Sequence, residues 1–202
     1  MSKPFFSVVT LSLNSSKNIK DCLISLYSQK FNNFEHIIQD GCSNDGTIEL
    51  INKHKTDKTF VISQKDSGLY DALNKAIKRC EGEYILLLHS DDCLYDENIL
   101  QNLFEFITTN HYPKVIIAGV EIIGNNRKLK RRWLPSLPTM FKIDTGWMAP
   151  HPGIVIKKGL AKSMPPYDNN LKISSDYDFE ISLFRKYYAN TLLFNRLLTT
   201  MK

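Results

Sequence analysis

Two adjacent acids, Asp91 and Asp92, follow an unbroken apolar run over residues 84–88, with His89 and Ser90 between. Five apolar residues in a row suit a strand that is buried on both faces. Such a strand delivers the residues that follow it to the carboxyl edge of an open α/β sheet, where ligands of that architecture bind. Adjacent carboxylates repel each other, so a hard divalent cation that also holds a phosphate group would stabilise them. A solvated turn is the alternative, because Asp is common where strands end.

Other polar residues lie at the ends of neighbouring predicted strands. Thr10 belongs to the first predicted strand, Asn14 begins the loop after it, and Asp40 begins the loop after the second strand. If these strands are parallel, their loops meet Asp91 and Asp92 at one edge of the sheet. A carboxylate there can accept from a nucleobase imide N–H, and a metal ion can bridge two phosphates.

Strands and helices alternate along the first part of the chain. Predicted strands cover residues 5–13, 34–39, 59–63, 84–88 and 114–120, and apolar residues recur at helical spacing between them. This alternation predicts an α/β protein with a mostly parallel central sheet and helices on both faces. No GxGxxG or GxxxxGK[ST] motif occurs, which counts against dinucleotide cofactors and P-loop nucleotide hydrolysis.

The pattern becomes irregular after residue 120. Residues 121–130 predict a hairpin that turns at Asn125 and Asn126, and closely spaced prolines then interrupt the chain. We therefore expect a single domain with a nucleotide-binding half, residues 1–120, and a second half, residues 121–202, that shapes the site of a second substrate.

Two further elements are predicted near the end of the chain. A last helix begins at about Asp176. The apolar segment 192–198 is interpreted either as a membrane-surface helix or as the stub of a longer tail.

Composition is that of a globular protein, because 43% of the 202 residues are hydrophobic and 23% are charged. No apolar run approaches the roughly 18 residues of a spanning helix, and the amino terminus lacks a signal-peptide pattern. The four cysteines lie far apart without metal-binding spacing, which favours reduced thiols. We expect a cytoplasmic protein, with peripheral attachment to the inner face of the cell membrane as an option.

Four motifs in order resemble glycosyltransferase family 2. They are Ser7-Val8-Val9-Thr10, the loop 40–47 (DGCSNDGT), the stretch 66–75 (DSGLYDALNK) and Ser90-Asp91-Asp92. The resemblance is close over about residues 5–110 and resumes at 151–153 and 174–178. It implies a GT-A fold and inverting transfer from a nucleotide-diphospho sugar, with Mn²⁺ or Mg²⁺ as cofactor.

The resemblance also implies roles for residues at matching positions. The implied donor-binding residues are Thr10, Asn14, Asp40, Asp66, Asp71, Asn74 and Asp91. Thr10 and Asp40 would line the nucleobase pocket, and the later residues would face the ribose, diphosphate or sugar. Two alternatives remain: a turn in which Asp40 caps its own loop with Ser43, and an i,i+4 surface pair of Asp71 with Lys75.

The metal and the base are implied in the same way. Asp92 would be the principal metal ligand, Asp91 would approach the ribose or the metal, and His151 is a third metal candidate or an ordinary loop histidine. Asp176 matches the family's general base and can also cap its helix, whereas Asp178 is expected to be structural. The sequence departs from the family where His89 or Ser90 replaces an acid before the Asp pair, and where Gly41 follows Asp40.

The basic run Arg127–Trp133 has three interpretations: a solvated hairpin, an anionic membrane or acceptor-diphosphate contact, and, least favoured, a nucleic-acid contact. We therefore expect a hexosyltransferase that uses a UDP-sugar and a saccharide or polyprenyl-diphosphate-linked acceptor in bacterial surface-polysaccharide assembly. No nucleic-acid partner is expected. A catalytically silent nucleotide-sugar-binding protein is the alternative.

Overall fold

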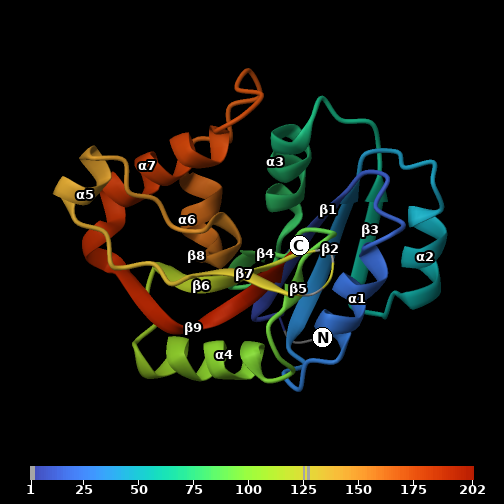
Figure 1. Ribbon diagram of the computed structural model, residues 1–202, viewed down its shortest axis with the longest axis horizontal. Coiled ribbons are helices and arrows are strands. Elements are labelled where there is room, and N and C mark those ends of the chain that lie inside the picture. The colour runs from blue at the N-terminus through green and yellow to red at the C-terminus, as the bar shows by residue number, and fades with distance from the viewer. Residues whose placement is uncertain (1–2, 125, 127) are drawn as a thin grey trace.

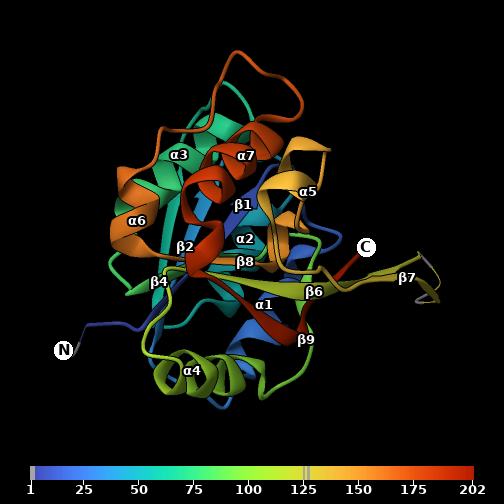
Figure 2. The same cartoon turned by 90° about the vertical axis from the view of Figure 1, so that its left-hand side faces the viewer.

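The computed structural model describes residues 3–124, 126 and 128–202 and shows one sheet with helices on both faces (Figures 1 and 2). The strands are β1 (Phe6–Ser12), β2 (Phe34–Asp40), β3 (Thr59–Ser63), β4 (Tyr84–Leu87), β5 (Cys93–Leu94), β6 (Val115–Ile123), β7 (Leu129–Trp133), β8 (Ile154–Lys157) and β9 (Thr191–Met201). The helices are α1 (Ile19–Tyr27), α2 (Thr47–His54), α3 (Leu69–Arg79), α4 (Ile99–Thr109), α5 (Met140–Asp144), α6 (Lys158–Ser163) and α7 (Ser175–Tyr187), with 3₁₀ turns η1 (His151–Gly153) and η2 (Tyr188–Asn190). The predicted α/β class is confirmed.

The sheet has the order β3-β2-β1-β4-β8-β6-β9-β5, with β7 paired to β6. Strands β3, β2, β1 and β4 are mutually parallel, which places their carboxyl ends at one edge. Strand β8 is antiparallel to both of its neighbours, β4 and β6. The predicted parallel arrangement holds for the first four strands, and the antiparallel pairs of the second half make the sheet as a whole mixed. The second half lacks the regular strand–helix alternation that parallel strands require.

The terminal segment 192–198 belongs to strand β9 and is not a membrane-surface helix. Strand β9 pairs in parallel with β6 and antiparallel with β5, so neighbouring strands occupy both of its edges. Phe194 and Leu198 are buried against the cluster that includes α4. Short apolar runs fit strands and helices equally well, and the strand partners become visible only in three dimensions.

The predicted hairpin at 121–130 is formed by antiparallel β6 and β7. Within the predicted turn, Asn125 lies outside the described residues, and so does Arg127 of the basic run. Among the described residues, none of the helices has the length and apolarity needed to cross a bilayer.

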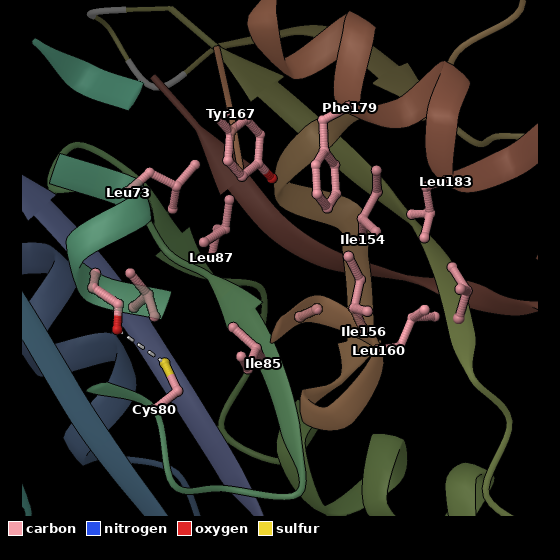
Figure 3. Packing of buried hydrophobic residues seen from close by; sticks show 14 of the residues in the cluster. Leu73, Cys80, Ile85, Leu87, Ile154, Ile156, Leu160, Tyr167, Phe179 and Leu183 are labelled. Carbon is pink, nitrogen blue, oxygen red and sulfur yellow. Dashed lines mark hydrogen bonds between the residues drawn. The ribbon is translucent and has the colours of Figure 1, made fainter. Parts of the chain in front are cut away.

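Buried apolar side chains fill both faces of the sheet. One cluster joins α3, α6 and α7 to the sheet, and α1, α2 and α4 cover the other face (Figure 2). Figure 3 shows Leu73 of α3, Leu160 of α6 and Leu183 of α7 converging on Ile85 and Ile154 of the sheet. Each fully buried Leu or Ile contributes about 1.5–3 kcal/mol. This packing fixes α3 and α7, which carry site residues, relative to the strand ends.

Candidate active site

Three loops meet at the carboxyl edge of β1, β2 and β4. The amide of Asn14 donates to Ser43 Oγ at 2.8 Å, and Asn14 Oδ1 accepts from the amide of Asn44 at 3.0 Å. Ser15 Oγ lies 2.8 Å from Ser90 Oγ. These contacts confirm that the three loops lie side by side, and they make Asn14 a brace between two of them.

A pocket of ≈ 350 Å³, here called the edge pocket, opens between the end of β1, the loop after β4 and the start of α3. It is lined by Leu11, Ser12, Leu13, Asp66, Gly68, Leu69, Ala72, His89, Ser90 and Asp91. Asp66 and Asp91 are thus the two predicted donor-binding residues that this pocket brings together. Both carboxylates stand among apolar walls, an arrangement that suits a ligand with a flat ring and a charged group.

Asp40 is fully buried and accepts four hydrogen bonds. The donors are the hydroxyls of Ser12, Ser43 and Ser63 and the amide of Ser43. Burial raises the pKa of Asp40, but the hydrogen bonds from Ser43 and Ser63 outweigh it and leave the pKa below its ordinary value. Asp40 therefore holds the loop together, as the turn interpretation expects, and reaches the edge pocket only through Ser12.

Thr10 is also inside the protein. Its side chain is fully buried, and its Oγ1 donates to the carbonyl oxygen of Leu88 at 2.7 Å and lies 2.8 Å from His36 Nε2. Burial lowers the pKa of His36 to about 3, so this imidazole is neutral. The structure thus places Thr10 in a polar contact beneath the strand ends, away from the lining of the edge pocket.

Asp71 and Asn74, both on α3, are engaged with the protein. Asp71 Oδ2 lies 2.8 Å from Lys75 Nζ, which is the surface pair considered as the alternative. Asn74 Nδ2 donates to the carbonyl oxygen of Tyr167 at 2.8 Å, and Asn74 Oδ1 accepts from the amide of Tyr167 at 2.9 Å. Asn74 therefore ties α3 to the segment before α7. Neither residue is among those that line the edge pocket.

The two adjacent acids differ in their surroundings. Asp91 lines the edge pocket, whereas Asp92 is only 2% exposed. Burial, followed by the charge of Asp91, raises the pKa of Asp92 to about 8. Within the described part of the chain, Asp92 Oδ2 has no hydrogen-bond partner. The accessible carboxylate is therefore Asp91, and Asp92 is a neutral acid near pH 7 unless a cation lies beside it.

The carboxylates at this edge of the sheet suit a cation whose remaining ligands come from the substrate. No group of three or more His, Cys, Asp or Glu residues in the described part of the chain forms a ready metal cage. Mg²⁺ in nucleotide sites is commonly held by one or two carboxylates together with substrate phosphates and water. Asp91, with Asp92 next to it, matches that pattern.

A second pocket of ≈ 260 Å³, here called the inner pocket, adjoins the first. It is lined by Leu69, Tyr70, Leu73, His89, Ile122, Trp133, Met148, Pro150, His151, Pro152, Asp176 and Met201. Leu69 and His89 line both pockets, so a molecule in one lies next to a molecule in the other. The phenol of Tyr70 donates to Asp176 Oδ1 at 3.1 Å and accepts from the amide of Ser175 at 3.2 Å.

Asp176 lies in the first turn of α7, where the helix dipole favours a negative charge. Asp178 is exposed and does not line the inner pocket, as expected for a structural residue. The helix therefore presents one of its two early acids, Asp176, to the cavity.

Two histidines stand where the pockets meet. The rings of His89 and His151 lie 6.5 Å apart, and His151 Nε2 is 3.0 Å from the hydroxyl of Tyr167. Burial lowers the pKa of His151 to about 4 and also lowers the pKa of His89. Both imidazoles are thus neutral near pH 7, and neutral imidazole can bind a metal or a hydroxyl group. In the sequence, His89 was noted only because it stands where the family often has an acid. Its position just after β4 was the signal for this site.

Glu180 is a buried acid beside the site that the sequence did not reveal. It is 1% exposed, its Oε2 accepts from the amide of Ala149 at 3.0 Å, and its Oε1 has no partner within the described residues. Burial raises the pKa of Glu180 to about 8. Its spacing of one helical turn from Asp176 was the available signal. Glu180 connects α7 to the segment containing Met148 and Pro150, which lines the inner pocket.

Tyr167 supports the site from the side. Its ring stacks on Phe179 at 4.4 Å between centroids (Figure 3). It also stacks on Tyr70 at 6.0 Å between centroids. The same residue contacts His151 through its hydroxyl and Asn74 through its backbone. Tyr167 therefore links α3, α7 and the histidine pair into one packed unit.

The described part of the basic run forms exposed strand β7. Arg132 pairs with Glu121 at 2.9 Å, and the guanidinium of Arg131 lies 5.1 Å from the ring centre of Trp133. Trp133 also reaches the inner pocket. Strand β7 thus exposes cationic side chains to solvent and contributes one aromatic side chain to the lining of the inner pocket.

Comparison with known proteins places this geometry in a family. Residues 7–165 match the family described as Glycosyl transferase family 2. The PGL/p-HBAD biosynthesis glycosyltransferase of Mycobacterium tuberculosis is 28% identical over 190 residues, covering 91% of this chain and 71% of the relative.

Two solved structures share the fold. Staphylococcus aureus TarS in complex with UDP-GlcNAc has a TM-score of 0.76 at 24% identity and covers 96% of this chain. The mannosyltransferase PcManGT from Pyrobaculum calidifontis, in complex with GDP-Man and Mn²⁺, has a TM-score of 0.67 at 15% identity and covers 99% of this chain. This chain spans 57% of the length of each of these two solved chains. With the family match over most of its length, the chain belongs to glycosyl transferase family 2 and is a glycosyltransferase with the GT-A fold.

Proposed function

We propose that this protein transfers a sugar, with inversion, from a UDP-sugar to a hydroxyl group of a saccharide or lipid-linked acceptor in surface-polysaccharide assembly. The observation that carries the proposal is the meeting of two pockets at Leu69 and His89, with Asp91 in one and Asp176 in the other. The edge pocket would take the nucleotide and the inner pocket the acceptor. TarS, which has the same fold, was solved with UDP-GlcNAc, and this supports the choice of donor.

The reaction is a single displacement at the anomeric carbon. Asp176 takes the proton of the acceptor hydroxyl, whose oxygen forms the new bond to carbon while the bond to the diphosphate oxygen breaks. The diphosphate leaves with the electron pair. The phenol of Tyr70 holds Asp176 Oδ1, so that Oδ2 is directed to the acceptor. A base on the face opposite the leaving group produces inversion.

Asp91 would hold the cation, with Asp92 as the second carboxylate and His151 or His89 as further contacts to the cation or the diphosphate. A bound Mn²⁺ or Mg²⁺ would supply Lewis-acid stabilisation of the departing diphosphate. Asp40, Thr10 and Asn14 would act through the loops that they brace.

Replacing the base tests the proposal. Asp176→Asn should lower the rate of sugar transfer at least 100-fold while UDP binding stays within about twofold, because the amide cannot take a proton. The measurement is product formation with labelled UDP-sugars and saccharide acceptors, alongside calorimetry with UDP. Asp178→Asn, which changes an exposed acid two residues along the same helix, is the matched control. Full activity in Asp176→Asn would refute the assignment, and wild-type nucleotide binding without transfer to any acceptor would favour a silent binding protein.

The acceptor side would also face a membrane. Lys130 and Arg131 of β7 are exposed, and Leu134, Leu137 and Phe141 follow with 58%, 44% and 78% of their surface exposed. Cations beside exposed apolar side chains suit an anionic lipid surface.

Sedimentation with lipid vesicles tests this contact. We expect binding to vesicles rich in phosphatidylglycerol, little binding to phosphatidylcholine alone, and a loss of several-fold in Arg131→Ala/Phe141→Ser. Equal binding to both lipids, or unchanged binding of the double variant, would rule out this surface.

A further inference from the structure

Another pocket, here called the flank pocket, opens between α3 and α6. Its lining includes Ile77 and Lys78 of α3, Lys162 of α6, Met164 just after α6 and Phe179 of α7. Its volume of ≈ 340 Å³ is within the range of about 300–1,000 Å³ for small-molecule sites. Within the described part of the chain, no residue that lines it also lines the edge pocket or the inner pocket. The flank pocket is therefore distinct from the candidate active site.

The floor of the flank pocket is apolar. A small cavity of ≈ 20 Å³ lies between it and the sheet, and the two share several lining residues, among them Ile77, Tyr167 and Phe179. Figure 3 shows the rings of Tyr167 and Phe179 side by side, with Ile154 of the sheet next to them. The walls of this cavity are apolar except at His151, whose Nε2 already contacts the Tyr167 hydroxyl. A water molecule would lack the polar partners that it needs there, so the end of an alkyl chain suits the cavity better.

The rim of the flank pocket is cationic. Lys78 and Lys162 are the charged residues of its lining, and both are exposed. Lys162 Nζ donates to the carbonyl oxygen of Lys78 at 3.0 Å, which brings the two residues together. Glu81 is the acid that pairs with Lys162, at 3.8 Å, and it also pairs with Lys158, at 3.1 Å. Lys78 forms no ion pair within the described residues. Three lysines thus face one carboxylate, and the rim keeps a net positive charge.

A cationic rim above an apolar floor fits a molecule with one alkyl chain and one anionic head group. Each methylene that leaves water for the floor raises the affinity about fourfold. The head group stays at the rim, where lysine amines attract an anion while they remain partly hydrated. A purely apolar ligand would leave the cations without a partner, and a small anion would leave the floor empty.

We propose that the flank pocket binds a soluble single-chain amphiphile whose head group is a carboxylate or a phosphate. The chain lies between α3 and α6, and the head group contacts Lys78 and Lys162. Figure 2 shows α6 and β7 on opposite sides of the molecule, so a bilayer in contact with β7 would not reach the flank pocket. The occupant is therefore a fatty-acid anion or an alkyl phosphate free in solution, and not a lipid held in a membrane.

Titration calorimetry with decyl phosphate, decanoate, decanol and decyltrimethylammonium tests this proposal, with each ligand kept below its micelle concentration. We expect the two anions to bind at least 10-fold more tightly than decanol, because only they complement the lysines. Decyltrimethylammonium should bind more weakly than decanol. In a series of alkyl phosphates, the affinity should rise about fourfold per methylene until the chain fills the pocket.

Removing the two charges tests the head-group contact. Lys78→Gln/Lys162→Gln should weaken the binding of decyl phosphate about 10-fold and change that of decanol less than twofold, because glutamine is polar but carries no charge. The matched control is Lys53→Gln/Lys55→Gln, which removes two exposed lysines at the end of α2, outside the pocket. The control has the same net charge as the first variant and should bind decyl phosphate as the wild type does.

Met164→Gln tests the chain contact separately. Met164 is half-buried and lines the flank pocket, so a polar side chain there should weaken the binding of decyl phosphate and of decanol alike, several-fold in each case. Thermal unfolding without ligand checks that each variant is folded.

Several outcomes would overturn the proposal. They are the absence of binding by any alkyl anion, equal affinities for decanol and decyl phosphate, and unchanged binding of decyl phosphate in Lys78→Gln/Lys162→Gln. If this double variant instead loses binding to phosphatidylglycerol vesicles while the wild type ignores free decyl phosphate, the lysines contact a membrane and the proposal is wrong. None of these outcomes bears on the proposed sugar transfer, which uses the edge pocket and the inner pocket.

Discussion

Buried carboxyl groups determine how the residues of this site behave. Asp40 keeps its charge because serine donors surround it, whereas Glu180 and Asp92 have pKa values of about 8 because burial is not offset in the same way. The acids that the sequence pattern predicted at the ends of strands and helices do lie at those ends. Which acid faces a cavity depends on side-chain packing, so coordinates were needed to see that serines surround Asp40 whereas Asp66 lines the edge pocket. The position of Thr10 in β1 was likewise predicted from the sequence, but the direction of its side chain was not.

The ionisation of Glu180 predicts a pH dependence of stability. Its folded pKa of about 8 lies above its ordinary value of 4.5, so the folded protein holds a proton that the unfolded chain releases. The stabilising contribution is fully present below pH 4.5 and is lost as the pH rises through 8, a change on the order of 5 kcal/mol. Glu180→Gln, which stays neutral, should match the wild type at pH 5 and exceed its unfolding free energy at pH 8.

Urea denaturation at pH 5, 6.5 and 8 measures this difference. Asp178→Asn changes an exposed side chain on the same helix. Its unfolding free energy should therefore vary with pH in the same way as that of the wild type. If the unfolding free energy of Glu180→Gln also varies with pH in the same way as that of the wild type, Glu180 is ionised in the folded protein.

At the scale of elements, regular alternation predicted the first half well. Apolar runs bounded by turn residues located β1 to β4 and the helices between them, because each such pattern reflects local burial. Strand β9 and the antiparallel insertion of β8 were not foreseen, since their pairing depends on partners far away in the chain. The turn η1 shows the same dependence, because it is held against β6 by a close approach of the two backbones.

That close approach predicts a large effect at Gly153. A Cβ atom there would lie 2.4 Å from the carbonyl oxygen of Ala118, and a backbone atom cannot move aside as a side chain can. Gly153→Ala should therefore lower the unfolding free energy by about 1–3 kcal/mol. In α6, a Cβ atom at Gly159 would meet nothing within 4 Å. Gly159→Ala should be neutral or stabilise by about 0.4–1 kcal/mol.

Chemical denaturation of the two alanine variants side by side checks this prediction. Similar stabilities would mean that η1 and β6 separate easily, and that the wall of the inner pocket formed by η1 is not rigid.

For the whole molecule, one continuous sheet brings the edge pocket and the inner pocket together. The parallel strands β1, β2 and β4 present the edge pocket, and β6, β9 and the turn η1 border the inner pocket. Strand β8, from the second half of the sequence, lies between β4 and β6 from the first half. Asp91 and Asp176 are 85 residues apart in the chain, yet they stand in neighbouring pockets because both halves build this sheet. The order of the motifs predicted the family, and the sheet explains why those motifs meet.

We propose that the edge pocket binds a UDP-sugar through a cation held at Asp91, and calorimetric titration of UDP with and without Mn²⁺ measures this dependence. The control is Asp57→Asn, which removes an exposed acid outside the pocket. We expect Mn²⁺ to tighten UDP binding at least 10-fold in the wild type and in Asp57→Asn, and to have no effect in Asp91→Asn, because the variant lacks the charge that holds the cation. If UDP affinity is the same with and without Mn²⁺, or if Mn²⁺ still tightens UDP binding in Asp91→Asn, then Asp91 does not hold the cation.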